Sequence, residues 1–245
     1  MATVSPAGGI PARSGRPSAR VPGALSPNCG PRRNGARPSL VVLHYTEMAT
    51  AEDARARLCD PEAEVSAHYL VSRQGEVTAL VPEELRAWHA GAGSWGAIED
   101  VNSHSIGIEL DNDGASPFPE PQMRALEGIL AAILLRWQIA PAGVIAHSDM
   151  APLRKRDPGP RFDWRRLALT GLSAWPDPHP PVPPDAAGFR ALLRAAGYPD
   201  VADAALLTAF RLRFRPGAQG PLDPADMALA QGVSRFAVDR VATTA

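Results

Sequence analysis

Two histidines follow short apolar runs, where their imidazoles could bind a metal ion. His44 comes directly after residues 40–43, and His147 comes directly after residues 144–146. Such runs predict buried strands, and strand ends in α/β sheets commonly present ligand-binding groups. A catalytic zinc ion accepts two imidazoles and one carboxylate, and its fourth tetrahedral position holds water. The pattern therefore predicts a metal site, provided that a carboxylate lies near His147.

Two carboxylates near His147 are candidates for the third ligand, Asp149 and Asp157. Pro158 favours an extended backbone at Asp157. In an extended segment, Lys155 and Asp157 project to the same face, which would bring a cation and a metal ligand into one pocket. The alternative interpretation is a basic surface loop that contains an aspartate by chance.

Glu109 is a carboxylate inside a predicted strand, residues 106–110, and it alternates with the apolar side chains of that strand. Its apolar neighbours indicate substantial burial. Burial of a carboxylate without a partner is costly and raises its pKa, which suits a general acid or base. The alternative is a glutamate on a solvated face of the sheet.

The elements that must position these residues can be predicted from periodicity and capping. Thr50 resembles a helix N-cap, and the helix that it opens should reach residue 57 or 58 before Pro61. Gly75 supplies the turn of a β-hairpin. Apolar residues at helical spacing from Pro121 to residue 137 predict a long helix that ends by Pro141.

The order of strands and helices predicts an α/β domain with a mixed β-sheet flanked by helices, plus a small C-terminal three-helix module. We expect a disordered arm at residues 1–37, rich in Gly, Pro, Ser and Arg, followed by a catalytic domain at residues 38–175. A proline-rich linker spans residues 176–185, and the helical module spans residues 186–240.

Composition excludes several functional classes. Lys and Arg number 25 against 26 Asp and Glu, so the chain lacks the charge excess typical of nucleic-acid binding. No apolar run is long enough to predict a transmembrane segment, and the first 25 residues lack the apolar stretch of a signal peptide. We therefore expect a cytoplasmic protein. Cys29 and Cys59 are too few for a disulfide scaffold and are interpreted as free thiols.

Six sequence blocks together resemble the zinc-dependent N-acetylmuramoyl-L-alanine amidases, the superfamily that includes phage-type amidases and peptidoglycan recognition proteins. The resemblance covers residues 40–175, with the blocks in the same order. The blocks are Val42-Leu43-His44-Tyr45-Thr46, Ser66-Ala67-His68-Tyr69-Leu70-Val71, Trp88-His89-Ala90-Gly91, Ser105-Ile106-Gly107-Ile108-Glu109-Leu110, Ala146-His147-Ser148-Asp149 and Lys155-Arg156-Asp157-Pro158-Gly159-Pro160. The C-terminal residues are similar to a three-helix peptidoglycan-binding module.

This resemblance implies specific roles. It implies one zinc ion per chain on His44, His147 and Asp157, with Asp149 a neighbour rather than a ligand. Glu109 and Lys155 would be the catalytic groups. Trp88 and His89 would line the substrate cleft.

The substrate implied by the resemblance is peptidoglycan or a muropeptide. The bond cut would be the amide between N-acetylmuramic acid, or its anhydro form, and L-alanine. We expect a monomer. Two alternatives stay open: a non-catalytic peptidoglycan-recognition protein, since some relatives have lost a metal ligand, and a periplasmic or envelope-associated location.

Overall fold

The computed structural model of the chain describes residues 25–177 and 179–236, and its centre is a five-stranded sheet with strand order β4-β3-β6-β2-β7. β3 and β4 are antiparallel, and the remaining neighbours are parallel. The predicted strands and the predicted mixed sheet flanked by helices are confirmed. Their bounds are Leu40–Tyr45 for β2, Tyr69–Val71 for β3, Val77–Ala79 for β4, Ser105–Leu110 for β6 and Val144–Ala146 for β7.

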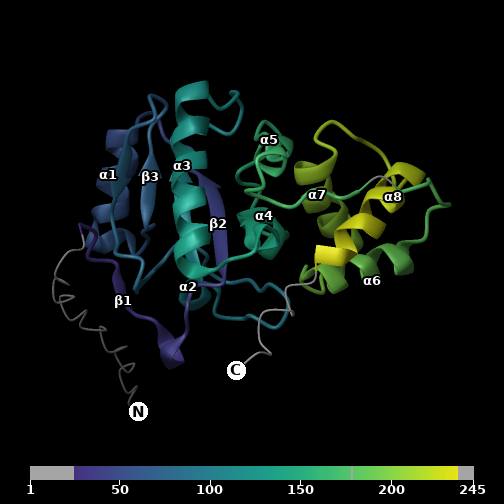
Figure 1. Cartoon of the computed structure of the whole chain (residues 1–245), viewed down its shortest axis with the longest axis horizontal. Coiled ribbons are helices and arrows are strands. Elements are labelled where there is room, and N and C mark those ends of the chain that lie inside the picture. The colour runs from purple at the N-terminus through teal and green to yellow at the C-terminus, as the bar shows by residue number, and fades with distance from the viewer. Residues whose placement is uncertain (1–24, 178, 237–245) are drawn as a thin grey trace, which may run out of the picture.

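One face of the sheet is covered by the long helix α3 (Glu120–Trp137) (Figure 1). Side chains alternate between the two faces of a strand, so Val41 and Leu43 of β2 point to the same side. They belong to a core that also contains Leu126 and Leu130 of α3. The predicted helix is confirmed, and it ends at Trp137, because Gln138 adopts a left-handed conformation with φ of 57°.

On the opposite face of the sheet, β2 and β7 share a core with the C-terminal helices, whereas β3 packs against α1 (Ala51–Cys59). The C-terminal helices are α6 (Ala186–Ala196), α7 (Asp203–Phe214) and α8 (Pro224–Val233), which confirm the predicted three-helix group. Leu40 and Val42 of β2 share a hydrophobic core with Phe189 of α6 and Phe210 of α7. The short helix α4 (His147–Met150) lies between the sheet and α7 (Figure 1). The C-terminal helices are thus a layer of the same α/β structure.

Shorter elements complete the fold. α1 (Ala51–Cys59) begins where predicted, because the Thr50 hydroxyl accepts a hydrogen bond from the Asp53 amide. The β3–β4 hairpin turns at Gly75, whose φ of 86° favours glycine. The remaining elements are β1 (Cys29–Pro31), β5 (Leu85–Ala87), α2 (Val101–His104), α5 (Trp164–Leu169), and single 3₁₀ turns at Arg33–Gly35, Pro61–Ala63, Pro141–Gly143 and Ser234–Phe236.

The predicted disordered arm at residues 1–37 is wrong for its last part, residues 25–37. β1 pairs with β5, and the Arg32 guanidinium donates to the carbonyl oxygens of Glu83 and Ser103. Those carbonyls are distant in the sequence, so the composition near Arg32 could not predict these hydrogen bonds. Residues 1–24 lie outside the described part of the chain.

Two expectations from composition can be compared with the described residues. Cys29 and Cys59 are free thiols, as predicted. Within residues 25–177 and 179–236, no helix is both long enough and apolar enough to cross a membrane.

Candidate metal centre and active site

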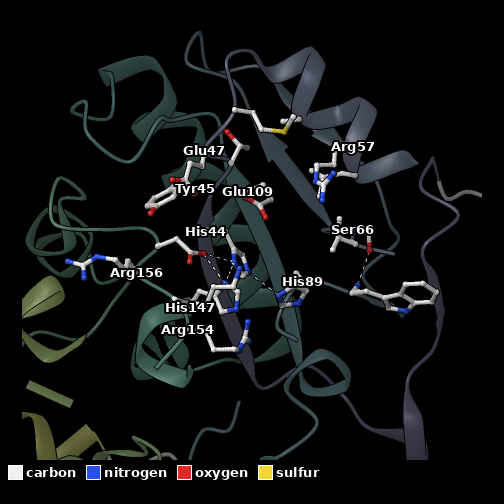
Figure 2. Close-up of a pocket in the computed structure, with 18 residues that line it drawn as sticks. His44, Tyr45, Glu47, Arg57, Ser66, His89, Glu109, His147, Arg154 and Arg156 are labelled. Carbon is white, nitrogen blue, oxygen red and sulfur yellow. Dashed lines mark hydrogen bonds and ion pairs between the residues drawn. The ribbon is translucent and has the colours of Figure 1, made fainter. Parts of the chain in front are cut away.

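Three side chains predicted to bind a metal meet at one end of the sheet (Figure 2). His44 is in β2, His147 begins α4, and Asp157 lies in the loop between α4 and α5. The two Nδ1 atoms are 2.9 Å apart, and each lies 2.9 Å from Asp157 Oδ2. All three residues are buried. This group could hold a metal ion.

The hydrogen-bond partner of His147 Nε2 shows which ring nitrogen of His147 carries the proton. Nε2 lies 2.9 Å from the carbonyl oxygen of Ala90, which can only accept a hydrogen bond. His147 therefore carries its proton on Nε2 when the ring is neutral. Its Nδ1, which faces Asp157, then bears a lone pair.

The protonation of His44 follows from a chain of three hydrogen bonds. The Ser105 hydroxyl donates to the carbonyl of Val101, so its oxygen accepts from His89 Nε2 at 3.2 Å. The other nitrogen of a neutral His89, Nδ1, must then accept from His44 Nε2 at 3.0 Å. His44 Nδ1 is left with a lone pair that faces Asp157.

Both histidines are therefore in the form that ligates a metal. Burial, and next the neighbouring His147, lower the pKa of His44 to about 4, so its ring is neutral at pH 7. The Nδ1 lone pairs of His44 and His147 and the carboxylate of Asp157 converge on one point, and this arrangement suits a cation.

Glu109 lies on β6 beside His44, its partner in the parallel register of β2 and β6. Figure 2 shows its carboxylate facing the same cavity as the histidines. One carboxylate oxygen, Oε2, is buried and has no hydrogen-bond partner among the described residues. Burial, and next the negative charge of Asp157, raise the pKa of Glu109 well above its ordinary value. An unpaired carboxylate of this kind can accept a proton from a reactant in the cavity.

The cavity has a volume of about 370 Å³. Lys155, the other predicted catalytic residue, lines it together with the predicted substrate-cleft residues Trp88 and His89. The positive charge of Lys155 opposes the rise in the pKa of Glu109, so the two charged groups interact across the cavity. Trp88 is half-buried, whereas the ring of His89 lies behind His44 and is only 8% exposed.

Asp149 is not part of the metal group and has structural partners of its own. Its carboxylate accepts from the Tyr198 hydroxyl at 2.7 Å, from Arg213 of α7 at 2.7 Å and from the Ala146 amide at 2.9 Å. Asp149 thereby joins the helix that begins with His147 to the C-terminal helices.

Sequence reasoning missed three residues that support the site. Ser105 fixes the protonation of His89, and Asn102 accepts hydrogen bonds from the backbone amides of His89 and Ala90. Gly107 leaves space for His89, because a Cβ there would lie 2.4 Å from the ring atom Cγ. Only Gly107 had a visible signal, since a glycine inside a strand often marks a close approach.

The fold and the site define an α/β protein with a buried His-His-Asp group at the ends of its parallel strands. A family model described as N-acetylmuramoyl-L-alanine amidase matches residues 34–160. The chain belongs to this family, and the predicted resemblance is confirmed.

Individual relatives agree with this assignment. The chain is 36% identical over 233 residues to N-acetylmuramoyl-L-alanine amidase AmiD of Escherichia coli K12, covering 80% of this chain and 82% of AmiD. It is 36% identical over 165 residues to 1,6-anhydro-N-acetylmuramyl-L-alanine amidase AmpD of Citrobacter freundii, covering 60% and 87%.

Two solved complexes have the same fold. The E. coli AmiD complex with anhydro-N-acetylmuramic acid-L-Ala-D-gamma-Glu-L-Lys superposes with a TM-score of 0.74 at 36% identity, covering 82% of this chain and 91% of that one. The Pseudomonas aeruginosa AmpDh3 complex with anhydromuramic pentapeptide has a TM-score of 0.72 at 31% identity, covering 83% and 93%. Both alignments cover more of the chain than the family model does.

Proposed function

We propose that this protein is a zinc-dependent amidase that hydrolyses the bond between N-acetylmuramic acid, or its anhydro form, and L-alanine. The observation that carries the proposal is that a His-His-Asp group shares one cavity with a half-buried glutamate, Glu109, whose buried Oε2 has no hydrogen-bond partner among the described residues. The family supports the bond that is cut, because its relatives are named for it. Retention of all three ligand types argues against a recognition protein without catalysis.

Zinc fits the donor set of His44, His147 and Asp157. Two neutral imidazoles with one carboxylate are a donor set of catalytic zinc sites, and the second nitrogen of each ring is already held by a partner. A zinc ion there would supply Lewis acidity and a nucleophilic water at neutral pH.

The residues around this site have separate tasks. Glu109 accepts a proton from water as the water oxygen adds to the amide carbonyl carbon. Glu109 then delivers this proton to the alanine nitrogen as the carbon–nitrogen bond breaks, so that a muramic carboxylate and a free amine leave. The Lys155 ammonium stabilises the negative charge that develops on the carbonyl oxygen, a contribution worth about 3–4 kcal/mol for a well-placed donor.

The peptide side of the scissile bond supplies the recognition chemistry. The ligand of the AmiD complex carries a γ-linked glutamate, whose α-carboxylate is free. Arg57 and Arg154 line the cavity and would meet such carboxylates. Trp88 offers a flat ring to the sugar or the peptide. We further propose residues 38–175 as the catalytic part of the chain.

The test compares two glutamates of the same cavity. Glu47 is exposed at the cavity, whereas Glu109 is half-buried beside His44. We expect Glu109→Gln to keep stoichiometric zinc and to lose activity on anhydro-muramoyl tripeptide by about 10²-fold or more. Glu47→Gln should retain both. His147→Ala should lose zinc as well as activity.

Zinc is measured by elemental analysis, and the products are identified by mass spectrometry. Full activity in Glu109→Gln would overturn the catalytic assignment. A zinc-free wild-type protein that binds the muropeptide without cutting it would establish the recognition alternative instead.

A further inference from the structure

A second pocket lies between the loop that carries Asp157 and the C-terminal helices. Its volume is about 950 Å³. One wall is formed by Arg156, Pro160 and Arg161 of the loop, and the other by α7 and the residues that follow it as far as Pro221. We call it the junction pocket, because each wall comes from a different part of the chain.

The junction pocket adjoins the active-site cavity. Arg156 lines both. Figure 2 shows Arg156 extending away from the histidines, toward the side where the ribbon has the colour of the C-terminal helices. Arg156 also directly precedes the predicted metal ligand Asp157 in the sequence. A ligand that leaves the active-site cavity past Arg156 would therefore enter the junction pocket.

The charge of the junction pocket is positive. Arg211 and Arg215 line it, but the two guanidiniums are paired with the two carboxylates of Asp223 and Asp226, neither of which lines the pocket. Arg156 and Arg161 are exposed and have no hydrogen bond or ion pair within residues 25–177 and 179–236. No Asp or Glu side chain lines the pocket. Two unpaired cations therefore face it.

The walls between these charges are largely apolar. Leu207 and Leu212 of α7 contribute side chains, together with Pro216 and Pro221. Two separated cations over an apolar wall suit isolated carboxylates on a peptide, whereas a continuous polyanion needs a denser array of basic groups. The net charge of the chain, −1, gives no wider field that would attract a polyanion.

We propose that the junction pocket binds a second, carboxylate-bearing peptide segment of polymeric peptidoglycan, beyond the unit that is cut. The proposal rests on the proposed amidase function. A soluble muropeptide is short enough to occupy the active-site cavity alone, whereas a polymer can occupy both cavities. The junction pocket therefore favours the polymer as substrate. The two unpaired cations come from the loop and not from the C-terminal helices, so those helices alone do not make the site.

The test uses one exposed arginine inside the junction pocket and one outside it. Arg161 lines the pocket, whereas Arg165 is equally exposed on α5 and does not line it. Arg161→Glu and Arg165→Glu are compared in the full chain. Binding to teichoic-acid-free sacculi is measured by pelleting, in a Glu109→Gln background so that the sacculi stay intact. Hydrolysis of anhydro-muramoyl tripeptide is measured in the otherwise wild-type chain.

We expect Arg161→Glu to weaken sacculus binding about tenfold or more, and to leave kcat/KM for the soluble tripeptide unchanged. Arg165→Glu should change neither quantity. Thr208→Glu, an exposed position on the opposite wall, should weaken sacculus binding as Arg161→Glu does. Conversion of the sacculus carboxylates to amides should abolish the difference between Arg161→Glu and Arg165→Glu.

Equal sacculus binding by Arg161→Glu and Arg165→Glu would overturn the proposal. An equal loss of soluble-tripeptide hydrolysis in Arg161→Glu would also overturn it, since Arg161 would then serve the cut unit. If Arg161→Glu still bound amidated sacculi more weakly than Arg165→Glu does, the ligand would not be a carboxylate, and the proposal would be overturned. A larger loss of binding to teichoic acid than to sacculi in Arg161→Glu would overturn it too, because the ligand would then be a polyanion. If the wild type cuts no muropeptide, the proposed amidase function is wrong. The comparison of sacculus binding between Arg161→Glu and Arg165→Glu would still show whether the junction pocket binds peptidoglycan, because it does not depend on hydrolysis.

Discussion

Loss of the Arg213 guanidinium should destabilise the whole protein, because it would leave the Asp149 carboxylate buried without a counter-charge. Asp149 is 0% exposed and Arg213 is 4% exposed. Their ion pair is 2.7 Å long, and Arg213 also donates to the Val144 carbonyl of β7. The guanidinium lies 4.2 Å from the ring centroid of Trp164. Arg213→Met removes the charge and keeps an unbranched side chain in the same space.

The expected loss can be estimated from the burial of this pair. Removal of one partner of a buried ion pair costs about 3–5 kcal/mol. The loss is a large part of the free energy of unfolding of a typical domain, about 5–15 kcal/mol. Asp149→Asn in the same chain should restore at least about 2 kcal/mol, because an amide is neutral. The amide can accept from Ala146 and donate to the Tyr198 hydroxyl.

Urea unfolding, followed by tryptophan fluorescence, measures both variants and the double variant. Arg165→Met, at an exposed site, should stay within about 0.5 kcal/mol of wild type. A loss of less than about 1 kcal/mol in Arg213→Met would show that Asp149 does not need this counter-charge. A double variant no more stable than Arg213→Met would show the same.

Three further predictions concern the site. Ser105→Ala removes the acceptor that fixes His89, and zinc affinity, measured by competition with a chelating dye, should fall about 10- to 100-fold. Gly107→Ala should destabilise by about 1–3 kcal/mol in urea, since the new Cβ meets the His89 ring, whereas Gly128→Ala, with open space around it, should be neutral or stabilising. Glu109 must be ionised to act as a base and its pKa is raised, so kcat/KM should fall as pH drops through a midpoint above the usual value of about 4.3. Glu109→Gln should lose that pH dependence together with its activity.

Local patterns were sufficient to predict most elements of the fold. The apolar run before His44 and the alternation around Glu109 placed both residues on strands, and the structure pairs them in adjacent positions. Helical spacing from Met123 onward gave α3, and the Thr50 cap gave the start of α1. These features depend on residues within a few positions of one another, so the sequence shows them directly.

Features that depend on distant partners could not be predicted in this way. The site depends on the contact of His89 with His44, 45 positions away, and no local pattern around either residue indicates this contact. The residues around Arg32 predict a solvated arm, because its hydrogen-bond acceptors, the carbonyls of residues 83 and 103, are distant in the sequence. The same holds for Asp149, whose partners Tyr198 and Arg213 lie beyond the proline-rich segment.

The shared core of the sheet and the C-terminal helices has a consequence for synthesis of the chain. One face of β2, with Leu40 and Val42, shares a core with Phe189 and Phe210, which leave the ribosome about 150 to 170 residues later. Until then this face is bare, and exposed apolar strands favour aggregation. Translation that stops within the proline-rich segment would therefore release a chain with all three proposed metal ligands but without the C-terminal helices. Such a fragment should be recognised by chaperones rather than accumulate as a small active enzyme.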